Sequence, residues 1–259
     1  MPVARAACSC AFAAAIMLAS PGARAAPDEI QVYTDEMDDP GQFGVELHLN
    51  YVPKGEKTPP YPGAMPSNHV TQLTPEFSYG ITKSLEAGLY LPAAISSDGT
   101  LYGTNGARVR LKFLAPRDDG DRFFWGLNTE FGYFSRRVSE SRWGMELRPI
   151  IGYRSSDWLF SFNPILEIDL GPDVSREPRF APALKLSRTV GHRLQAGFEY
   201  YGDFGPIHHR IGASERAHAL YGALDAEIAG VDVNFGIGRG YVNAGDIWVV
   251  KAIISLPFN

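Results

Sequence analysis

Hydrophobic and polar residues alternate with a period of two along most of this chain. In residues 75–92, PEFSYGITKSLEAGLYLP, the alternation continues on both sides of a short turn at residues 82–84. Phe77 and Leu89 fall on the apolar side of this hairpin, and Glu76 falls on the polar side. Successive side chains of a strand point to opposite faces of a sheet, so the pattern predicts strands with one apolar and one polar face.

The same pattern predicts twelve strands, most of them 11 to 15 residues long. Strands of soluble domains have a modal length of about 5 or 6 residues, whereas a tilted strand that crosses a bilayer needs about 9 to 11. The segment 216–229, RAHALYGALDAEIA, also suits a helix, because it is rich in alanine and leucine. The predicted strands are residues 42–53, 68–81, 84–95, 102–115, 122–136, 141–154, 157–170, 178–190, 193–205, 216–229, 231–241 and 246–258.

The connections between these strands alternate between longer and shorter ones. Short examples are TKS, SSD and GH, and long ones are PKGEKTPPYPGAMPSN and GPIHHRIGASER. Outer-membrane barrels have an even number of antiparallel strands, short periplasmic turns and longer external loops. A sheet in hydrocarbon must also close, because an open edge would leave backbone groups without partners. The fold class predicted is therefore all-β, a transmembrane antiparallel up-and-down β-barrel of about 12 strands whose last segment pairs with its first.

The two faces of the predicted strands differ in charge. The apolar runs on one face, such as Val231, Val233, Phe235 and Ile237, are interrupted by no Asp, Glu, Lys or Arg, as a lipid-facing surface requires. In a soluble β-sandwich the apolar face would instead form the core, and this alternative remains open. Four tryptophans fall near strand ends and are predicted to lie at the membrane interfaces: Trp125, Trp143, Trp158 and Trp248. The residues predicted to line the lumen are Glu46, His48, Glu76, Glu86, Arg108, Arg110, Lys112, Glu130, Glu146, Arg148, Glu167, Asp169, Lys185, Arg193, Glu199, Asp225, Glu227 and Lys251.

The first 25 residues have the features of a secretory signal peptide. Residues 1–5 supply a short basic start that ends in Arg5, residues 6–18 are an apolar run, and Ala23-Arg24-Ala25 resembles a cleavage site. Both cysteines, Cys8 and Cys10, lie in this leader, so the mature chain is predicted to form no disulfide. We therefore divide the chain into a signal peptide (1–25), an acidic periplasmic N-terminal segment (26–41) and an outer-membrane barrel (42–259).

The composition excludes some partners. Without Arg5 and Arg24 the chain has 22 basic and 29 acidic residues, and such a balance argues against nucleic-acid binding. The acidic stretch YTDEMDDPG could bind calcium, but it lacks the ligand spacing of a calcium loop, so a solvated periplasmic linker is the preferred interpretation. No cofactor or metal site is predicted.

Catalytic motifs were sought among the histidines and glycines. A membrane-barrel lipase needs a serine and a histidine within hydrogen-bond reach. His48 has no serine two residues away on its strand, and His208 and His209 fall in a long loop, where they suit a solvated or weakly metal-binding surface. The glycines of GIGRG, residues 236–240, precede no helix, so they are interpreted as strand glycines at a crowded position. The chain is not predicted to be an enzyme.

The stretches IQVYTDEMDDPGQFGVELHLNYV, LTPEFSYGITKSLEAGLYLP and GARVRLKFL resemble a group of uncharacterised proteobacterial outer-membrane barrels. The chain is also similar in plan to the barrels named for the MetA pathway of phenol degradation. The resemblance implies an outer-membrane location and passage of small, hydrophobic or aromatic compounds, and it assigns no binding residue.

The expected function is that of a porin-like channel for small solutes. In this case the lumen is a narrow polar pore, whereas in the alternative its charges neutralise one another and fill the middle. The alternative function is a non-conducting structural or binding barrel whose long loops, residues 53–68 and 206–216, contact an external partner. The partners expected are outer-membrane lipids, the outer-membrane assembly machinery and an unknown solute.

Overall fold

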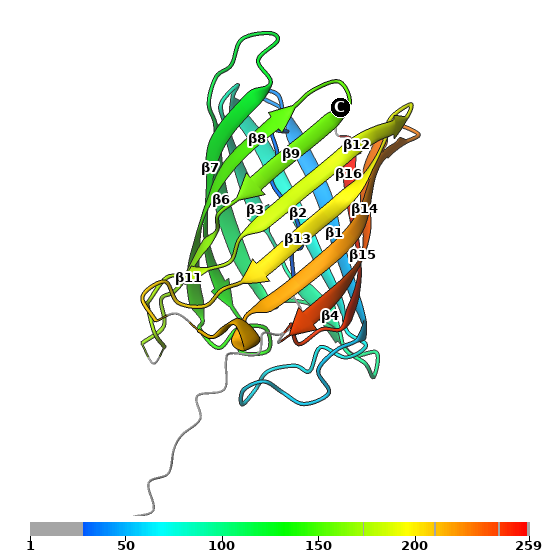
Figure 1. Cartoon of the computed structure of the whole chain (residues 1–259). Helices are drawn as coiled ribbons and strands as arrows, with labels where there is room; N and C mark the ends of the chain where they lie inside the picture. Colours follow the sequence, from blue (N-terminus) through cyan, green and yellow to red (C-terminus); the bar gives the residue numbers. More distant parts are fainter. Residues whose placement is uncertain (1–27, 173, 210, 243, 258–259) are drawn as a thin grey trace, which may run out of the picture.

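Antiparallel strands form a closed barrel in the computed structural model of this chain, which describes residues 28–172, 174–209, 211–242 and 244–257 (Figure 1). In this described part, no helix is long and apolar enough to cross a membrane. The predicted signal peptide and the terminal Phe258 and Asn259 lie outside the described residues. The strands are β1 (Phe43–Lys54), β2 (Thr71–Thr82), β3 (Leu85–Tyr90), β4 (Ala93–Ile95), β5 (Leu101–Tyr102), β6 (Gly106–Leu114), β7 (Phe123–Phe134), β8 (Trp143–Arg154), β9 (Trp158–Asn163), β10 (Leu166–Asp169), β11 (Arg179–Phe180), β12 (Ala183–Gly191), β13 (Leu194–Asp203), β14 (Ala217–Ile228), β15 (Val231–Val242) and β16 (Trp248–Pro257).

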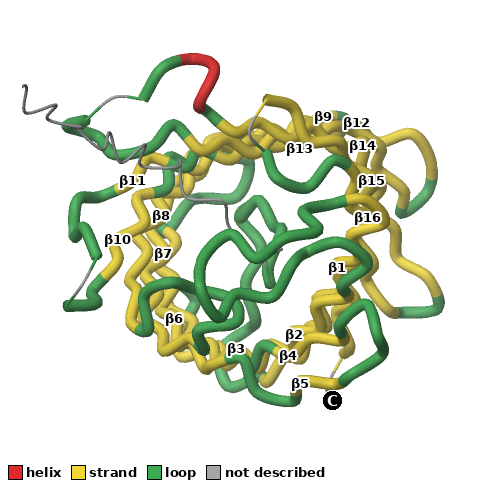
Figure 2. The backbone as a smooth tube through the Cα atoms, turned by 90° about the horizontal axis from the view of Figure 1, so that it is seen from below, coloured by secondary structure: helices red, strands yellow, loops and turns green. Residues whose placement is uncertain are grey.

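Pairing of β1 with both β2 and β16 closes the barrel, as Figure 2 shows from one end. The pair β1 and β16 runs antiparallel from Gly44 opposite Pro257 to Tyr51 opposite Val250. When strand segments that continue one another, such as β3 and β4 or β9 and β10, are counted together, each pairs with its neighbours along the chain, which is the up-and-down order that was predicted. Closure removes both sheet edges, so the backbone groups along the strands find partners within the sheet.

The sixteen strand segments make up twelve ribbons, because several ribbons are interrupted. The β3–β4, β9–β10 and β11–β12 ribbons each break at a proline: Pro92, Pro164 and Pro182. Proline has no backbone N–H to donate to the ladder, so the pairing stops and resumes after it. The predicted ribbons 84–95, 157–170 and 178–190 therefore exist, with a break inside each.

Residues 216–229, whose composition also suits a helix, contain the strand β14. β14 pairs with β13 and with β15 along its length, and tertiary pairing overrides the helical propensity of its alanines and leucines. The glycines 236–240 lie within β15, as predicted for crowded strand positions. A Cβ at Gly238 would approach the ring of Tyr221 to 2.3 Å, so only glycine leaves room for this buried tyrosine.

The short connections lie at one end of the barrel and the long ones at the other (Figure 1). The short-turn end, at the top of Figure 1, includes the β8–β9 and β12–β13 turns. The long-loop end, at the bottom, includes the connections after β1 and after β13, and the latter contains a 3-10 turn, Ala213–Glu215.

The outer surface of the barrel is apolar and the interior is charged. On the outside, Phe113, Trp125 and Phe198 are 36%, 52% and 60% exposed. On the inside, His48 and Glu76 are 0% and 1% exposed. A soluble protein has the reverse arrangement, with a hydrophobic interior and a polar surface.

Candidate functional site

The structure buries nine of the residues predicted to line the lumen. The buried ones are His48, Glu76, Glu86, Lys112, Glu130, Arg148, Lys185, Glu199 and Lys251. The remaining predicted residues lie on the same strand faces with partial exposure, except Arg193, whose side chain is 57% exposed near the short-turn end. The four tryptophans are exposed on the outer surface, 42% to 52%, near the strand ends. Their contact with membrane interfaces stays a prediction.

Part of the stretch that precedes β1 is buried inside the barrel. Ile30, Val32, Tyr33 and Thr34 are between 4% and 6% exposed. We name residues 28–41 the N-terminal segment. The interpretation of YTDEMDDPG as a solvated linker is wrong for Tyr33, Thr34 and Asp35, whose side chains are buried, whereas the side chain of Glu36 is 76% exposed and residues 39–41 are exposed. The periplasmic assignment of this segment stays a prediction.

Tyr33 fixes the middle of the N-terminal segment. Its backbone N–H donates to Asn163 Oδ1 at 2.7 Å, and its carbonyl accepts from Ser161 Oγ at 2.6 Å. Its hydroxyl lies against the hydroxyl of Tyr90 and donates to Glu130 Oε1 at 3.2 Å. Side chains of β9 thus satisfy backbone groups that would otherwise be buried without partners.

The ring of Tyr33 packs in a hydrophobic cluster at the short-turn side of the lumen. Its buried neighbours in this cluster are Leu114, Phe124, Ile150 and Leu159. Full burial of a side chain of this size is worth about 1.5–3 kcal/mol, so packing holds the segment as well as charge does.

Glu29 forms ion pairs with two arginines of the barrel wall. Its carboxylate lies 2.6 Å from Arg108 Nη2 and 3.4 Å from Arg148 Nη1, and only 2% of its side chain is exposed. Arg148 also donates to the carbonyl of Gln31 at 3.2 Å. These partners stand more than 75 residues away along the chain, so no local pattern marks them.

Asp35 makes a second set of ion pairs at the short-turn end. Arg154 contacts its carboxylate at 2.6 Å and 2.8 Å in a bidentate arrangement, and Arg117 contacts it at 2.5 Å. Lys112 donates to the carbonyl of Glu36. The segment therefore runs from near Arg108 toward the short-turn end, where β1 begins.

Five of the basic residues on the side of the lumen formed by β6, β8 and the β6–β7 turn form ion pairs or hydrogen bonds with the N-terminal segment, whereas Arg110 of β6 forms ion pairs with Glu76 and Glu86 of the barrel. We name these five residues the basic wall: Arg108, Lys112, Arg117, Arg148 and Arg154.

Acidic residues gather on the side formed by β13, β14, β15 and β1, which we name the acidic wall: Glu46, Glu199, Asp225, Glu227 and Asp232. Lysines and an arginine neutralise three of its carboxylates. Lys251 contacts Glu199 and donates to the carbonyl of Ile30 at 2.9 Å; the other pairs are Lys185 with Asp225 at 2.7 Å and Arg193 with Glu227.

Two carboxylates of the acidic wall lack a lysine or arginine partner among the described residues. Glu46 accepts from Ser255 Oγ at 2.6 Å and lies 3.7 Å from His48 Nε2. Asp232 makes neither an ion pair nor a hydrogen bond with the described part of the chain.

A cavity of about 710 Å³ lies between the N-terminal segment and the acidic wall. All five acidic-wall residues line it, whereas Lys112 is the sole basic-wall residue that does so within the described ranges. Its carboxylate lining is Asp35, Glu36, Asp38, Glu46, Glu76, Glu86, Glu199, Asp225, Glu227 and Asp232, and its basic lining is Arg110, Lys112, Lys185 and Arg193. The open part of the lumen is thus strongly acidic.

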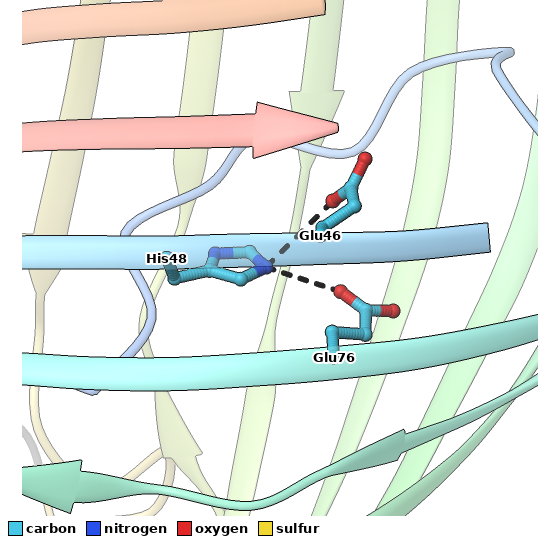
Figure 3. A group of neighbouring side chains, drawn as sticks. All are labelled: Glu46, His48 and Glu76. Carbon is cyan, nitrogen blue, oxygen red and sulfur yellow. Dashed lines mark hydrogen bonds and ion pairs between the residues drawn. The ribbon is translucent and has the colours of Figure 1, made fainter. Parts of the chain in front are cut away.

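Glu46, His48 and Glu76 point toward one another from β1 and β2 (Figure 3). His48 Nε2 lies 3.1 Å from Glu76, and the three donor atoms are close enough to hold one metal ion. Arg110 already contacts Glu76 at 2.5 Å and Glu86 at 2.7 Å, and its charge would repel a bound cation. We interpret the group as an ion-pair network, and the absence of a metal site stays a prediction.

The loop histidines contact an acidic residue of another long loop. His209 Nδ1 lies 2.5 Å from Glu177, and the backbone N–H groups of His208 and His209 donate to the same carboxylate. The hydrogen bond from His209, followed by those from the backbone, lowers the pKa of Glu177. The two histidines are 72% and 84% exposed, so they form part of the surface at the long-loop end.

No protein-family model matches this chain, and no curated protein is similar to it. Solved structures of outer-membrane barrels share its fold. An outer membrane channel of Pseudomonas putida F1, of the group COG4313, is 12% identical with a TM-score of 0.60 and covers 89% of this chain and 100% of its own. The KdgM porin (8% identical, TM-score 0.55) and the NanC porin (10%, 0.54) each cover 83% of this chain and 99% of their own. At these identities the likeness concerns the fold, and the similarity to MetA-pathway barrels stays a prediction.

Proposed function

We propose that this chain is a passive outer-membrane channel for small polar solutes, without catalytic activity. The observation that carries the proposal is a barrel with an apolar outside, a charged inside and a cavity of about 710 Å³ in its lumen. Porins and an outer membrane channel among the solved structures with this fold support it. The charged lining favours polar solutes over the hydrophobic or aromatic compounds that the family resemblance implies.

The proposal includes a location and an orientation. The signal peptide would export the chain, the assembly machinery would insert it, and lipids would contact the apolar surface. The short-turn end would face the periplasm and the long loops the outside, as in outer-membrane barrels.

Single-channel recording in planar bilayers tests the proposal, and residues 26–259 contain no cysteine, so one can be introduced for labelling. Asp232→Cys places a thiol at the cavity, and a bulky charged thiol reagent should reduce its conductance. Phe235→Cys on the same strand places the thiol on the outer surface and should be insensitive. Absence of conductance, or an equal response of both variants, would contradict the proposal.

The alternative is a non-conducting barrel whose long loops bind an external partner. The N-terminal segment favours it, because buried residues such as Val32 and Tyr33 fill part of the lumen. Swelling of liposomes in solutes of graded size separates the two functions. Swelling supports the channel, and its absence together with loop-dependent partner binding supports the alternative.

A further inference from the structure

The N-terminal segment neutralises the basic wall of the lumen, and on the other side it contacts Lys251 and packs Ile30 against Tyr221 while the acidic wall still borders the cavity. It contacts every residue of the basic wall, through ion pairs or through hydrogen bonds to its carbonyl groups. The five residues of the acidic wall all border the cavity. A solute in this cavity therefore meets carboxylates from both sides.

The segment is a concentrated source of negative charge. Residues 28–39 contain six carboxylates and no lysine, arginine or histidine. Glu29 and Asp35 neutralise arginines. Asp38 accepts from Ser78 at 2.5 Å and forms no ion pair with a lysine or arginine of the described residues. Charge in a narrow, low-dielectric passage raises the local concentration of counter-ions, so the excess carboxylates attract cations.

We propose that residues 28–39 determine the charge selectivity of the passage: they neutralise the basic wall, make the open lumen prefer cations, and on removal shift the preference toward anions. This inference rests on the proposed channel function and concerns which small solutes pass.

Removal of the segment has two effects, and both make the charge of the lumen more positive. It takes six negative charges out of the lumen, and it exposes the guanidinium groups of Arg108, Arg148 and Arg154. Arg108 would keep Glu130, and Arg148 would keep Glu146, as partners on the wall. Arg154 would lose Asp35 and Glu36, which are its ion-pair partners among the described residues.

The experiment compares reversal potentials in a potassium chloride gradient across a planar bilayer. The full chain is expected to prefer potassium. Deletion of residues 28–39 should lower the ratio of potassium to chloride permeability by about threefold or more. Because the segment also packs in the barrel, circular dichroism and heat-dependent gel mobility must show that the deletion variant is folded.

A second variant keeps the segment and removes its charge. It carries Asp28→Asn, Glu29→Gln, Asp35→Asn, Glu36→Gln, Asp38→Asn and Asp39→Asn, and its permeability ratio should also fall. It provides the same test if the deletion variant does not fold.

A third variant tests whether the exposed arginines of the basic wall contribute to the fall in the ratio of potassium to chloride permeability. In the deletion background, Arg108→Gln, Arg148→Gln and Arg154→Gln should restore part of the potassium preference. If the deletion acted solely through a wider pore, these substitutions would leave the ratio unchanged, which would contradict the role of the wall.

The outcomes separate this inference from the channel itself. A conducting full chain whose ratio is unchanged by deletion and by charge removal overturns the inference and leaves the channel. A full chain that is closed while the deletion variant conducts also overturns it, because the segment would then be a plug. If no folded variant conducts, the channel function itself fails, and the inference fails with it.

Discussion

The two walls of the lumen obtain counter-charges in different ways. On the acidic wall, Glu199 and Asp225 pair with lysines of neighbouring strands, so the barrel neutralises them itself. On the basic wall, Arg154 and Arg117 have their ion pairs with a peptide outside the sheet. Glu199 and Asp225 of the acidic wall are thus neutralised within the sheet, whereas Arg154 and Arg117 of the basic wall depend on a separate segment of the chain for their ion pairs.

The largest loss of stability is expected when an arginine of the basic wall is replaced. Arg148→Ala leaves Glu29 and Glu146 buried with one fewer cation, and loss of one partner from a buried pair costs about 3–5 kcal/mol. Urea unfolding in detergent micelles measures the change in the free energy of unfolding. Asp232→Asn on the acidic wall is the matched control and should change it by less than about 0.5 kcal/mol, since Asp232 has no described partner. Equal changes in the free energy of unfolding for the two variants would mean that the two walls do not differ in their dependence on ion pairs.

A smaller loss of stability is expected from Tyr33→Phe. The substitution leaves the hydroxyl of Tyr90 and the carboxyl of Glu130 without this buried partner, at a cost of about 1–3 kcal/mol. Limited proteolysis should then release the N-terminal segment sooner, and the unfolding midpoint should fall. Tyr79→Phe on the outer surface controls for loss of a hydroxyl and should be near neutral. An unchanged cleavage rate for Tyr33→Phe would show that its hydroxyl does not hold the segment.

The stability of a loop contact at the long-loop end is expected to depend on pH. In this contact the carboxyl group of Asp246 has the hydroxyl of Ser67 as its partner instead of a cation. Burial, together with the nearby charge of Glu56, raises the pKa of Asp246 to about 6, although Ser67 donates to it. Because the folded pKa is the higher one, the stabilisation of this loop contact is greatest below about pH 4 and is lost as pH rises through about 6. After correction for intrinsic rates, amide exchange near Ser67 should be about tenfold faster at pH 8 than at pH 5. Asp246→Asn should abolish the difference, and a pH dependence that survives it would refute this assignment.

The smallest effect is expected from one carboxylate of the acidic wall in the full chain. Asp232→Asn removes a single charge from the cavity and should lower the ratio of potassium to chloride permeability by less than about twofold. Reversal potentials measure the ratio, and Thr189→Val at the same cavity is the uncharged control. A larger change from the threonine would show that charge on this wall does not govern passage.

The alternation of side chains was enough to predict the strands, their order and the closure of the barrel. It even assigned residues 216–229 to a strand against their helical propensity. The breaks within ribbons could not be predicted from the sequence. Pro92 and Pro164 interrupt the pairing, while Pro75 lies within β2 without ending it. Whether a proline breaks a strand depends on its partner across the sheet, which the local sequence does not contain.

Whether the N-terminal segment folds into the lumen could not be predicted from the sequence, for a physical reason. Six carboxylates in a short stretch suggest solvation, because isolated buried charges are very costly. Their compensation comes from Arg108, Arg148 and Arg154, which lie far away in the sequence. The signal available was the alternation of Ile30 and Val32 with polar residues, which is unusual for a linker. A second signal was the presence of three basic residues on one strand in RVRLK, without an equal number of acids beside them.

The position of the N-terminal segment has a consequence for biogenesis. Its contacts reach β6, β8, β9 and β16, and the chain continues from it directly into β1. The seam between β1 and β16 is the last to be made when strands are added in order. Because the segment leads directly into β1 and its Ile30 carbonyl binds Lys251 of β16, it tethers the two strands that meet at this seam and adds a side-chain contact to their backbone pairing.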